Sequence, residues 1–320
     1  MKKKYAVIIR VCLIAILTIA MILLPICMFS MGDSYAENPT NPYRELKVPV
    51  SIEKFAGQYF ITDSYHGQVI CSNSPSAPLN KWKVMAAGLS IPHGIAYDGK
   101  NYVILDTENN QVIVSRKLGD TFQKVQYLEN IGIRPHDIYY DAAEKAFYVW
   151  SSMTGQMYIL KASGADGKLA VSEIRALPEL MNRYVRSFYV LGEYILFPSG
   201  VDTGYLMLVE KKNFKVAWRI PVTSDIAGMA DIAIIGAYFY LTVSTDSSGD
   251  QKQAKIIRTT DLTSLARGKY EDVSSWFPDL GVPYYFTNIE GQYYMTASGK
   301  ASLYRFKGET NKLNNIEVIY

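Results

Sequence analysis

The chain predicts an all-β fold, a six-bladed β-propeller of four-stranded antiparallel blades. Three stretches align without gaps: 59–72 (YFITDSYHGQVICS), 102–115 (YVILDTENNQVIVS) and 147–160 (FYVWSSMTGQMYIL). Three weaker copies lie at 194–209, 238–258 and 293–306. The aromatic residues that open the six copies are spaced by 43, 45, 47, 44 and 55 residues. A period of about 40–50 residues with four strands per unit is typical of propeller blades.

Each copy contains two short apolar runs on either side of a turn. In the second copy the turn holds Asn109 and Asn110, and paired Asn residues tolerate the left-handed backbone of a tight hairpin. The strands expected for the first blade are 49–55, 58–63, 68–72 and 81–86. The fourth strands expected for the later blades are 122–128, 168–176, 214–221, about 269–274 and 316–320. We expect few helical turns, at 179–183 and 262–267, and closure by contact between the first and last blades, with 43–47 available as a sealing strand.

The runs ITDSYHGQVIC (61–71) and ILDTENNQVIV (104–114) resemble the core of the NHL repeat. Residues 48–320 resemble six-bladed NHL-like and gluconolactonase-like (TolB-like) propellers. The resemblance implies the fold, but that fold carries binding proteins, scaffolds and several enzymes. It also implies that Asp63 and Asp106 are structural, with carboxylates that cap turn amides.

A gluconolactonase-like activity would need a calcium site of carboxylate and Asn oxygens at the channel mouth. Glu53, Asp231 and Asn288 could supply part of such a site. His residues stand in the second and third blades where further oxygen ligands would be needed, which argues against lactonase activity.

Residues 1–36 predict a hydrophobic targeting helix. Lys2–Lys4 and Arg10 precede an apolar run at 11–31, and Ser34–Ala36 provides small residues before a cleavage point. The run is long for a signal peptide and nearly long enough to span a bilayer, so a cleaved signal and an uncleaved anchor both remain open. Either one places the propeller outside the membrane, as a secreted or cell-surface domain, with membrane contact only through this segment.

Residues 37–47 contain two prolines and predict a polar linker before a propeller at 48–320. The net charge of +3 includes Lys2–Lys4, so the propeller is close to neutral. It has no basic stripe, which argues against a nucleic-acid partner. The sequence also lacks the GxSxG, P-loop, HExxH and CxxC motifs.

Propeller topology puts the connections between blades and the turns between second and third strands on one face, around the channel mouth. All three His residues of the chain, His66, His93 and His136, map to this face. His93 and His136 occupy equivalent positions at the start of the first strand of adjacent blades, in PHG and PHD. They could bind a metal or act as an acid–base pair. Alternatively they hydrogen-bond within the turn that follows each proline, and His66 is an ordinary turn residue.

Other blades place aromatic and charged groups at the same depth. These are Arg134, Tyr184, Arg186, Asp231, Tyr284, Tyr285 and Asn288. A ring of aromatic and cationic groups suits a sugar or an anionic ligand, although aromatic residues also pack blade against blade.

Two classes of function follow. The favoured one is an extracytoplasmic binding module for a glycan, small anionic ligand, peptide or protein partner on the face that bears His93 and His136. The alternative is a metal-dependent, lactonase-like lyase or hydrolase with one divalent metal, zinc or calcium, and with His93 and His136 as ligands or as acid and base. The first is favoured because the His residues follow no recognisable spacing motif and no nucleophile is evident.

Overall fold

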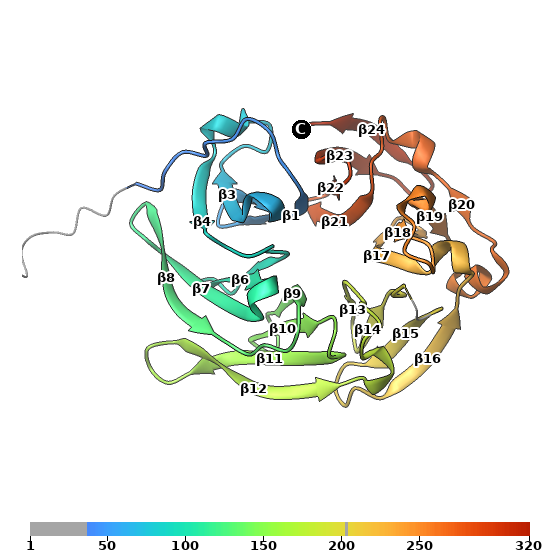
Figure 1. The fold of residues 1–320 in the computed structure, drawn as a ribbon, viewed down its shortest axis with the longest axis horizontal. Coiled ribbons are helices and arrows are strands. Elements are labelled where there is room, and N and C mark those ends of the chain that lie inside the picture. Colours follow the sequence, from blue (N-terminus) through green and yellow to red (C-terminus); the bar gives the residue numbers. More distant parts are fainter. Residues whose placement is uncertain (1–36, 202–203) are drawn as a thin grey trace, which may run out of the picture. The chain divides into compact units, whose positions relative to one another are not determined.

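The computed structural model describes residues 37–201 and 204–320, and residues 38–320 form one compact unit. This unit consists of six four-stranded antiparallel sheets arranged as blades around a central axis (Figure 1). The predicted propeller is therefore confirmed. The predicted targeting helix lies in residues 1–36, outside the described residues. Among the helices that the structure does describe, none is long and apolar enough to cross a membrane.

Each blade uses four consecutive strands, which pair in chain order. Blades 1 and 2 contain β1 (Pro49–Phe55), β2 (Gln58–Asp63), β3 (Gln68–Ser72), β4 (Lys83–Ala87), β5 (Ile95–Tyr97), β6 (Tyr102–Asp106), β7 (Gln111–Leu118) and β8 (Thr121–Leu128). Blades 3 and 4 contain β9 (Pro135–Asp141), β10 (Ala146–Ser151), β11 (Gln156–Ser163), β12 (Lys168–Ala176), β13 (Tyr189–Leu191), β14 (Tyr194–Phe197), β15 (Tyr205–Glu210) and β16 (Val216–Pro221). Blades 5 and 6 contain β17 (Gly228–Ile235), β18 (Tyr238–Thr245), β19 (Lys255–Thr259), β20 (Glu271–Asp272), β21 (Pro283–Ile289), β22 (Gln292–Ala297), β23 (Ser302–Gly308) and β24 (Leu313–Val318).

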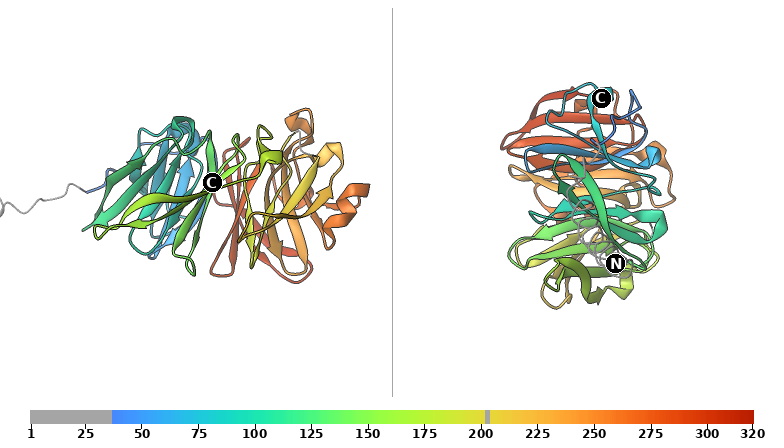
Figure 2. Two further views of the ribbon diagram at one scale, coloured as in Figure 1. Left: turned by 90° about the horizontal axis from the view of Figure 1, so that it is seen from below. Right: turned by 90° about the vertical axis from the view of Figure 1, so that its left-hand side faces the viewer.

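The core lies between neighbouring blades, which follow one another around the disc (Figure 2). Each buried cluster draws its residues from the facing sheets of two adjacent blades. Every residue of β6 and of β10 is buried, which explains why these strands are apolar up to their last residues, Asp106 and Ser151, instead of alternating. Trp150 of blade 3 packs on Phe197 of blade 4, with 4.6 Å between ring centroids. The outermost strand β12 is mostly exposed. Burial between blades therefore fixes the radial position of each strand.

The helical turns of the described residues are short 3₁₀ segments: η1 (Ser64–His66), η2 (Leu79–Lys81), η3 (Thr107–Asn109), η4 (Pro178–Leu180), η5 (Ser224–Ile226), η6 (Gln251–Gln253), η7 (Leu262–Arg267) and η8 (Ser274–Trp276). η1 and η3 each end in a left-handed residue, Gly67 with φ 60° and Asn110 with φ 53°. Of the predicted Asn pair, Asn110 has the expected left-handed backbone, whereas Asn109 belongs to the 3₁₀ turn η3. The carboxylate of Asp106 accepts a hydrogen bond from the amide of Ser90 at 2.6 Å, as its predicted capping role requires.

The predicted linker lies against blade 1. We call residues 38–48 the strap. Its Pro39 carbonyl accepts a hydrogen bond from Val84 N at 2.7 Å, and Asn41 N donates to the Trp82 carbonyl at 2.8 Å. The strap therefore runs beside β4, the outer strand. Residues 43–47 form no strand, so the sealing strand expected there is absent from this described segment.

The ring closes by contact between blades 1 and 6, which share no strand. Lys54 Nζ lies 2.6 Å from a carboxylate oxygen of Glu290. Trp82 Nε1 donates to the Tyr320 hydroxyl at 3.0 Å. The C-terminus ends beside blade 1, as Figure 1 shows. The predicted closure by simple contact is confirmed.

Candidate functional site

Three cavities follow one another along the channel. The first strand of each blade starts on the face that carries the blade-to-blade connections. We call this face the His face, because His93 and His136 stand at the start of two of these strands. A cavity of about 320 Å³, the mouth cavity, opens on this face. A constriction of about 20 Å³ lies in mid-channel. A second cavity of about 360 Å³, the far cavity, is lined by the ends of β9, β17 and β21 and so opens on the opposite face.

Two His rings contact each other near the channel axis. The rings of His93 and His136 lie 3.9 Å apart between centroids, tilted by 42°. Both side chains are buried. Their equivalent places at the start of adjacent blades bring them together, as the sequence predicted.

Each imidazole has a defined set of polar neighbours. His93 Nδ1 lies 2.9 Å from the Ile91 carbonyl and 3.1 Å from Thr107 Oγ1. His136 Nε2 lies 3.3 Å from the Tyr184 hydroxyl and 3.4 Å from the Tyr284 hydroxyl. Burial lowers the pKa of His93 to about 3 and also lowers the pKa of His136, with the His93 ring adding to the effect. Both rings are therefore neutral at pH 7.

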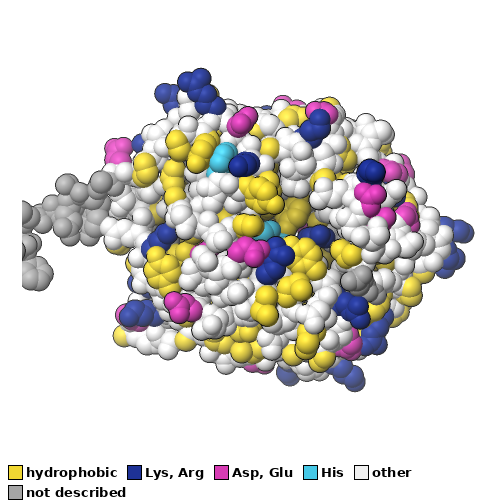
Figure 3. Space-filling view, in the orientation of Figure 1, with side chains coloured by type: hydrophobic (Ala, Val, Ile, Leu, Met, Phe, Trp, Pro, Cys, Tyr) yellow, Lys and Arg dark blue, Asp and Glu magenta, His cyan; other side chains and the backbone are white. Residues whose placement is uncertain are grey.

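Two guanidinium groups lie over one aromatic ring at the mouth. The central carbons of the Arg134 and Arg186 guanidiniums lie 4.8 and 4.7 Å from the centroid of the Tyr184 ring. Arg134 forms an ion pair of 2.7 Å with Glu108. Arg186 donates to the Met229 carbonyl at 3.4 Å and has no carboxylate partner within the described residues. The mouth cavity therefore carries an unneutralised positive charge. Figure 3 shows basic and hydrophobic side chains, with a His, around the centre of the disc.

The backbone is strained at equivalent points in three successive blades. Ile91, Arg134 and Tyr184 have φ values of 51°, 57° and 52°. Each stands two residues before a side chain of the site, namely His93, His136 or Arg186. Ile is β-branched, and Ile91 and Arg134 also precede prolines, so this conformation is costly. Such strain concentrates at functional sites, and single-sequence reasoning had no signal for it.

Three buried polar atoms at the mouth cavity have no hydrogen-bond partner within the described residues. They are Ser64 Oγ, Arg134 Nε and Thr245 Oγ1, from blades 1, 3 and 5. A buried polar group without a partner costs about 1–3 kcal/mol. Their residues line the mouth cavity, but the atoms themselves have almost no accessible surface. Sequence analysis did not find Ser64 and Thr245, because isolated hydroxyl residues carry no motif.

The structure brings together six of the ten predicted site residues. These six are His93, Arg134, His136, Tyr184, Arg186 and Tyr284. Asp231 and Asn288 line the far cavity, and Tyr285 lines both the constriction and the far cavity. They belong to the channel but not to its mouth on the His face.

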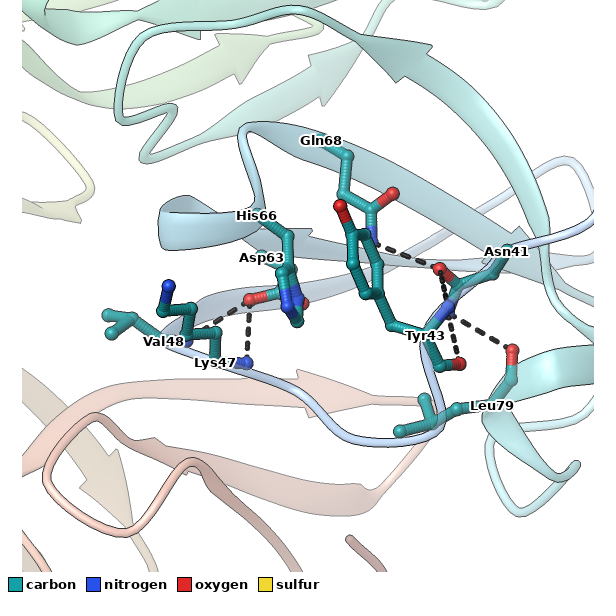
Figure 4. A network of polar contacts seen from close by, with 8 residues as sticks. All are labelled: Asn41, Tyr43, Lys47, Val48, Asp63, His66, Gln68 and Leu79. Atoms are coloured by element: carbon teal, nitrogen blue, oxygen red, sulfur yellow. Dashed lines mark hydrogen bonds and ion pairs between the residues drawn. The ribbon is translucent and has the colours of Figure 1, made fainter.

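His66 lies apart from the mouth cavity, in the polar network that holds the strap (Figure 4). Its Nδ1 is 2.6 Å from the Asp63 carboxylate, and the Tyr43 ring stacks on it with centroids 3.6 Å apart. The same carboxylate accepts the amides of Lys47 and Val48 at 3.0 and 3.1 Å. This arrangement supports a structural role for His66.

The described residues do not fit a calcium site made from the predicted oxygen ligands. Asn288 is exposed on the opposite face, where its side-chain oxygen accepts the Gly291 amide at 3.0 Å. Glu53 accepts the Thr287 hydroxyl at 3.1 Å. Within residues 37–201 and 204–320, no group of three or more His, Cys, Asp or Glu side chains could hold a metal ion. The His93–His136 pair therefore lacks a third ligand of these types there.

Three carboxyl groups lie deeper in the channel, on the first strands of blades 1, 3 and 5. Burial raises the pKa of Glu53 to about 8, that of Asp137 to about 8 and that of Asp231 to about 7. Asp137 accepts the Phe188 amide at 3.0 Å, and Asp231 accepts the Phe286 amide at 2.8 Å. Each Asp thus joins its blade to the next. Asp137 was missed as a site residue, although it follows His136 directly.

No family model matches the chain. No curated protein matches it either. Among solved structures, the propeller is similar in fold to a putative 6-phosphogluconolactonase from Bacteroides fragilis, at 13% identity and a TM-score of 0.58, covering 85% of this chain and 83% of that one. It is likewise similar to streptogramin B lyase, at 13% identity and a TM-score of 0.58, covering 87% and 85%. Kuenenia stuttgartiensis hydrazine synthase matches at 14% identity and a TM-score of 0.57, covering 87% and 80%.

These similarities define the class of protein. The chain is a six-bladed β-propeller whose fold is similar to that of a putative lactonase and a lyase, in agreement with the resemblance seen in its repeats. At these identities the likeness concerns the fold alone, so an activity has to be argued from the site.

Proposed function

We propose that the propeller binds a small anionic ligand in the mouth cavity. The observation that carries this proposal is the pair of guanidinium groups over Tyr184, of which Arg186 has no carboxylate partner among the described residues. Arg is the side chain best suited to planar, bidentate recognition of carboxylate or phosphate. An anion at this point would neutralise a charge that the described residues leave uncompensated.

The surroundings of the two guanidiniums support a ligand with several oxygen atoms. Ser64, Arg134 and Thr245 line the same cavity from three blades, and each has a buried polar atom without a partner among the described residues. The neutral His pair adds no charge, but it presents polar edges beside the Tyr184 and Tyr284 hydroxyls. A volume of about 320 Å³ is within the usual range for small-molecule pockets. A hydroxylated carboxylate or a phosphorylated small molecule matches this set of groups.

A second candidate is catalysis on that ligand. The specific observation in its favour is His136, whose neutral ring has Nε2 within 3.4 Å of two phenol hydroxyls. A neutral imidazole beside a hydroxyl can accept a proton from a bound substrate. The structural neighbours described as a putative lactonase and a lyase favour this candidate. Binding ranks first, because the neighbours share only the fold and the site has no evident nucleophile.

Export, as predicted from residues 1–36, would place this site outside the membrane. The ligand would then be met in the extracytoplasmic space. This location and any metal requirement are tested by fractionation of cells and by metal analysis of the purified protein.

The binding proposal is tested by calorimetric titration of the full chain with D-gluconate and with sorbitol, its neutral polyol counterpart. We expect saturable binding of gluconate only, weakened at least tenfold by Arg186→Gln. Arg219→Gln is the matched control, because Arg219 is exposed on β16 and pairs with Glu179. Equal binding of sorbitol and gluconate, or unchanged gluconate binding in Arg186→Gln, would refute the proposal.

A further inference from the structure

The far cavity is lined by phenol and carboxyl groups, whereas the mouth cavity is lined by Arg side chains. It opens on the other face, and its walls include four Tyr side chains: Tyr139, Tyr189, Tyr285 and Tyr293. The hydroxyls of all four form no hydrogen bond with any described residue. No Lys, Arg or His is among the described residues that line it. The cavity therefore offers acceptors and aromatic surface, but no cationic group.

Two carboxyl groups lie at the inner end of this cavity. Asp137 and Asp231 are 8% and 4% exposed, and both line its wall. Burial raises the pKa of each, because little water reaches the charged form. Burial raises the pKa of Tyr189 and of Tyr285, and the nearby Asp231 carboxyl adds to both shifts. The phenol and carboxyl oxygens thus converge in one region whose lining includes no Lys, Arg or His, and a bound cation would favour the ionised carboxylates that burial disfavours.

We propose that the far cavity binds a small organic cation of the alkylammonium class. An ammonium group donates hydrogen bonds to carboxylate and phenol oxygens, and aromatic faces attract it through cation–π interaction. Ile138, Ile232 and Ile234 line the same cavity and suit the alkyl portion of such a ligand. The volume of about 360 Å³ accommodates a small amine.

An organic cation fits this cavity better than a metal ion. No group of three or more His, Cys, Asp or Glu in the described ranges could hold a metal. Both Asp carboxylates already accept backbone amides, from Phe188 and Phe286, so each has only part of its acceptor capacity left. An alkylammonium ion, which can donate hydrogen bonds to the remaining acceptor positions and place its alkyl part against the aromatic and aliphatic walls, matches these residues.

The test is calorimetric titration of the full chain with n-butylammonium chloride and, separately, with n-butanol, its neutral counterpart. Wild-type protein should bind the ammonium saturably and should not bind the alcohol. Asp231→Asn should weaken binding at least tenfold, while its amide oxygen can still accept the Phe286 amide. Asp120→Asn, in the exposed turn between β7 and β8, is the matched control and should bind as the wild type does.

A second variant covers the case in which Asp231→Asn fails to fold. Tyr189→Phe removes one free hydroxyl and keeps the ring, so we expect threefold or greater weakening. Tyr194→Phe, on the exposed start of β14, is its control and should have no effect. Absence of saturable ammonium binding, equal binding of butanol, or wild-type affinity in either cavity variant would overturn the inference.

Discussion

The His93 and His136 rings contact each other near the channel axis, with 3.9 Å between their centroids, although they belong to different blades. Each occupies the same position in its repeat, so the near six-fold arrangement of the blades brings the two rings together. Both are buried and uncharged, which makes the pair part of the channel wall as well as part of the site.

Replacing His93 with Ala should destabilise the protein by about 1–3 kcal/mol, because the Ile91 carbonyl loses its partner in a buried place. This differs from the near-neutral effect of an exposed residue. Urea denaturation followed by Trp fluorescence measures the difference in unfolding free energy. A change below about 0.5 kcal/mol would mean that the imidazole makes no net contribution to stability.

Stability should fall as pH rises from 6.5 to 8.5. The pKa values of Asp137 and Asp231 are about 8 and 7 in the folded state, above the ordinary 3.8, so the folded state keeps protons that the unfolded state has released. The lowered pKa of His93 makes stability rise with pH, but only between about pH 3, its pKa in the folded state, and pH 6.5, its ordinary pKa. Above pH 6.5 the channel carboxyls therefore dominate, with at most about 1.4 kcal/mol lost per pH unit for each group.

The measurement is thermal denaturation of the wild type and of Asp137→Asn at pH 6.5, 7.5 and 8.5. The wild-type melting temperature should drop across this series, and the variant should show a smaller drop. A wild-type melting temperature that rises with pH would contradict the assignment of raised pKa values to these carboxyls.

The strap should depend on the stacking of Tyr43 on His66. Tyr43→Ala removes a ring contact of 3.6 Å and should cost about 1–2 kcal/mol, with faster proteolysis within residues 38–48. Tyr127→Ala, at a Tyr that is 53% exposed on β8, is the control and should be close to neutral. Equal protease sensitivity of the two variants would show that the stack does not hold the strap.

Gly67 should resist substitution more strongly than Gly57. Both have positive φ, but a Cβ at Gly67 would lie 2.5 Å from the Leu89 carbonyl oxygen, whereas a Cβ at Gly57 meets nothing within 4 Å. Each Ala variant carries about 1–2 kcal/mol of backbone strain, and Gly67→Ala adds an overpacking cost of about 1–3 kcal/mol. Chemical denaturation of the two variants measures this difference. Equal stabilities would show that the Leu89 carbonyl can move away.

The sequence predicted the fold in detail because burial between blades leaves continuous apolar strands at a regular spacing. The strands expected at 49–55, 58–63, 68–72 and 168–176 appear with those bounds, and so does the turn at 262–267. The last strand lies at Leu313–Val318 instead of 316–320, and the described residues contain eight short 3₁₀ segments where two helical turns were expected. The fifth blade is less well predicted, since its outer strand β20 has only two residues, Glu271–Asp272, within the expected 269–274. Outer strands pack on one side only, so their sequence signal is weak.

The proximity of His93 and His136 was predicted, because both occupy the same position in adjacent repeats. The sequence did not predict how deep in the channel each side chain lies. Asn288 and Asp231 lie on strands that line the channel and run along it, and a few residues along such a strand move a side chain from one face of the disc toward the other. The strained backbone at Ile91 and the unpartnered hydroxyls depend on contacts between blades, which no local pattern records.

The central claim is that the mouth cavity binds an anion through Arg134 and Arg186. The most direct measurement is anomalous diffraction from crystals of the protein soaked in selenate, a tetrahedral dianion that scatters strongly near the selenium edge. The account predicts a selenate peak within hydrogen-bond distance of the Arg186 guanidinium, and its loss in crystals of Arg186→Gln. A mouth cavity without selenate, in crystals where the ion occupies other basic sites, would contradict it.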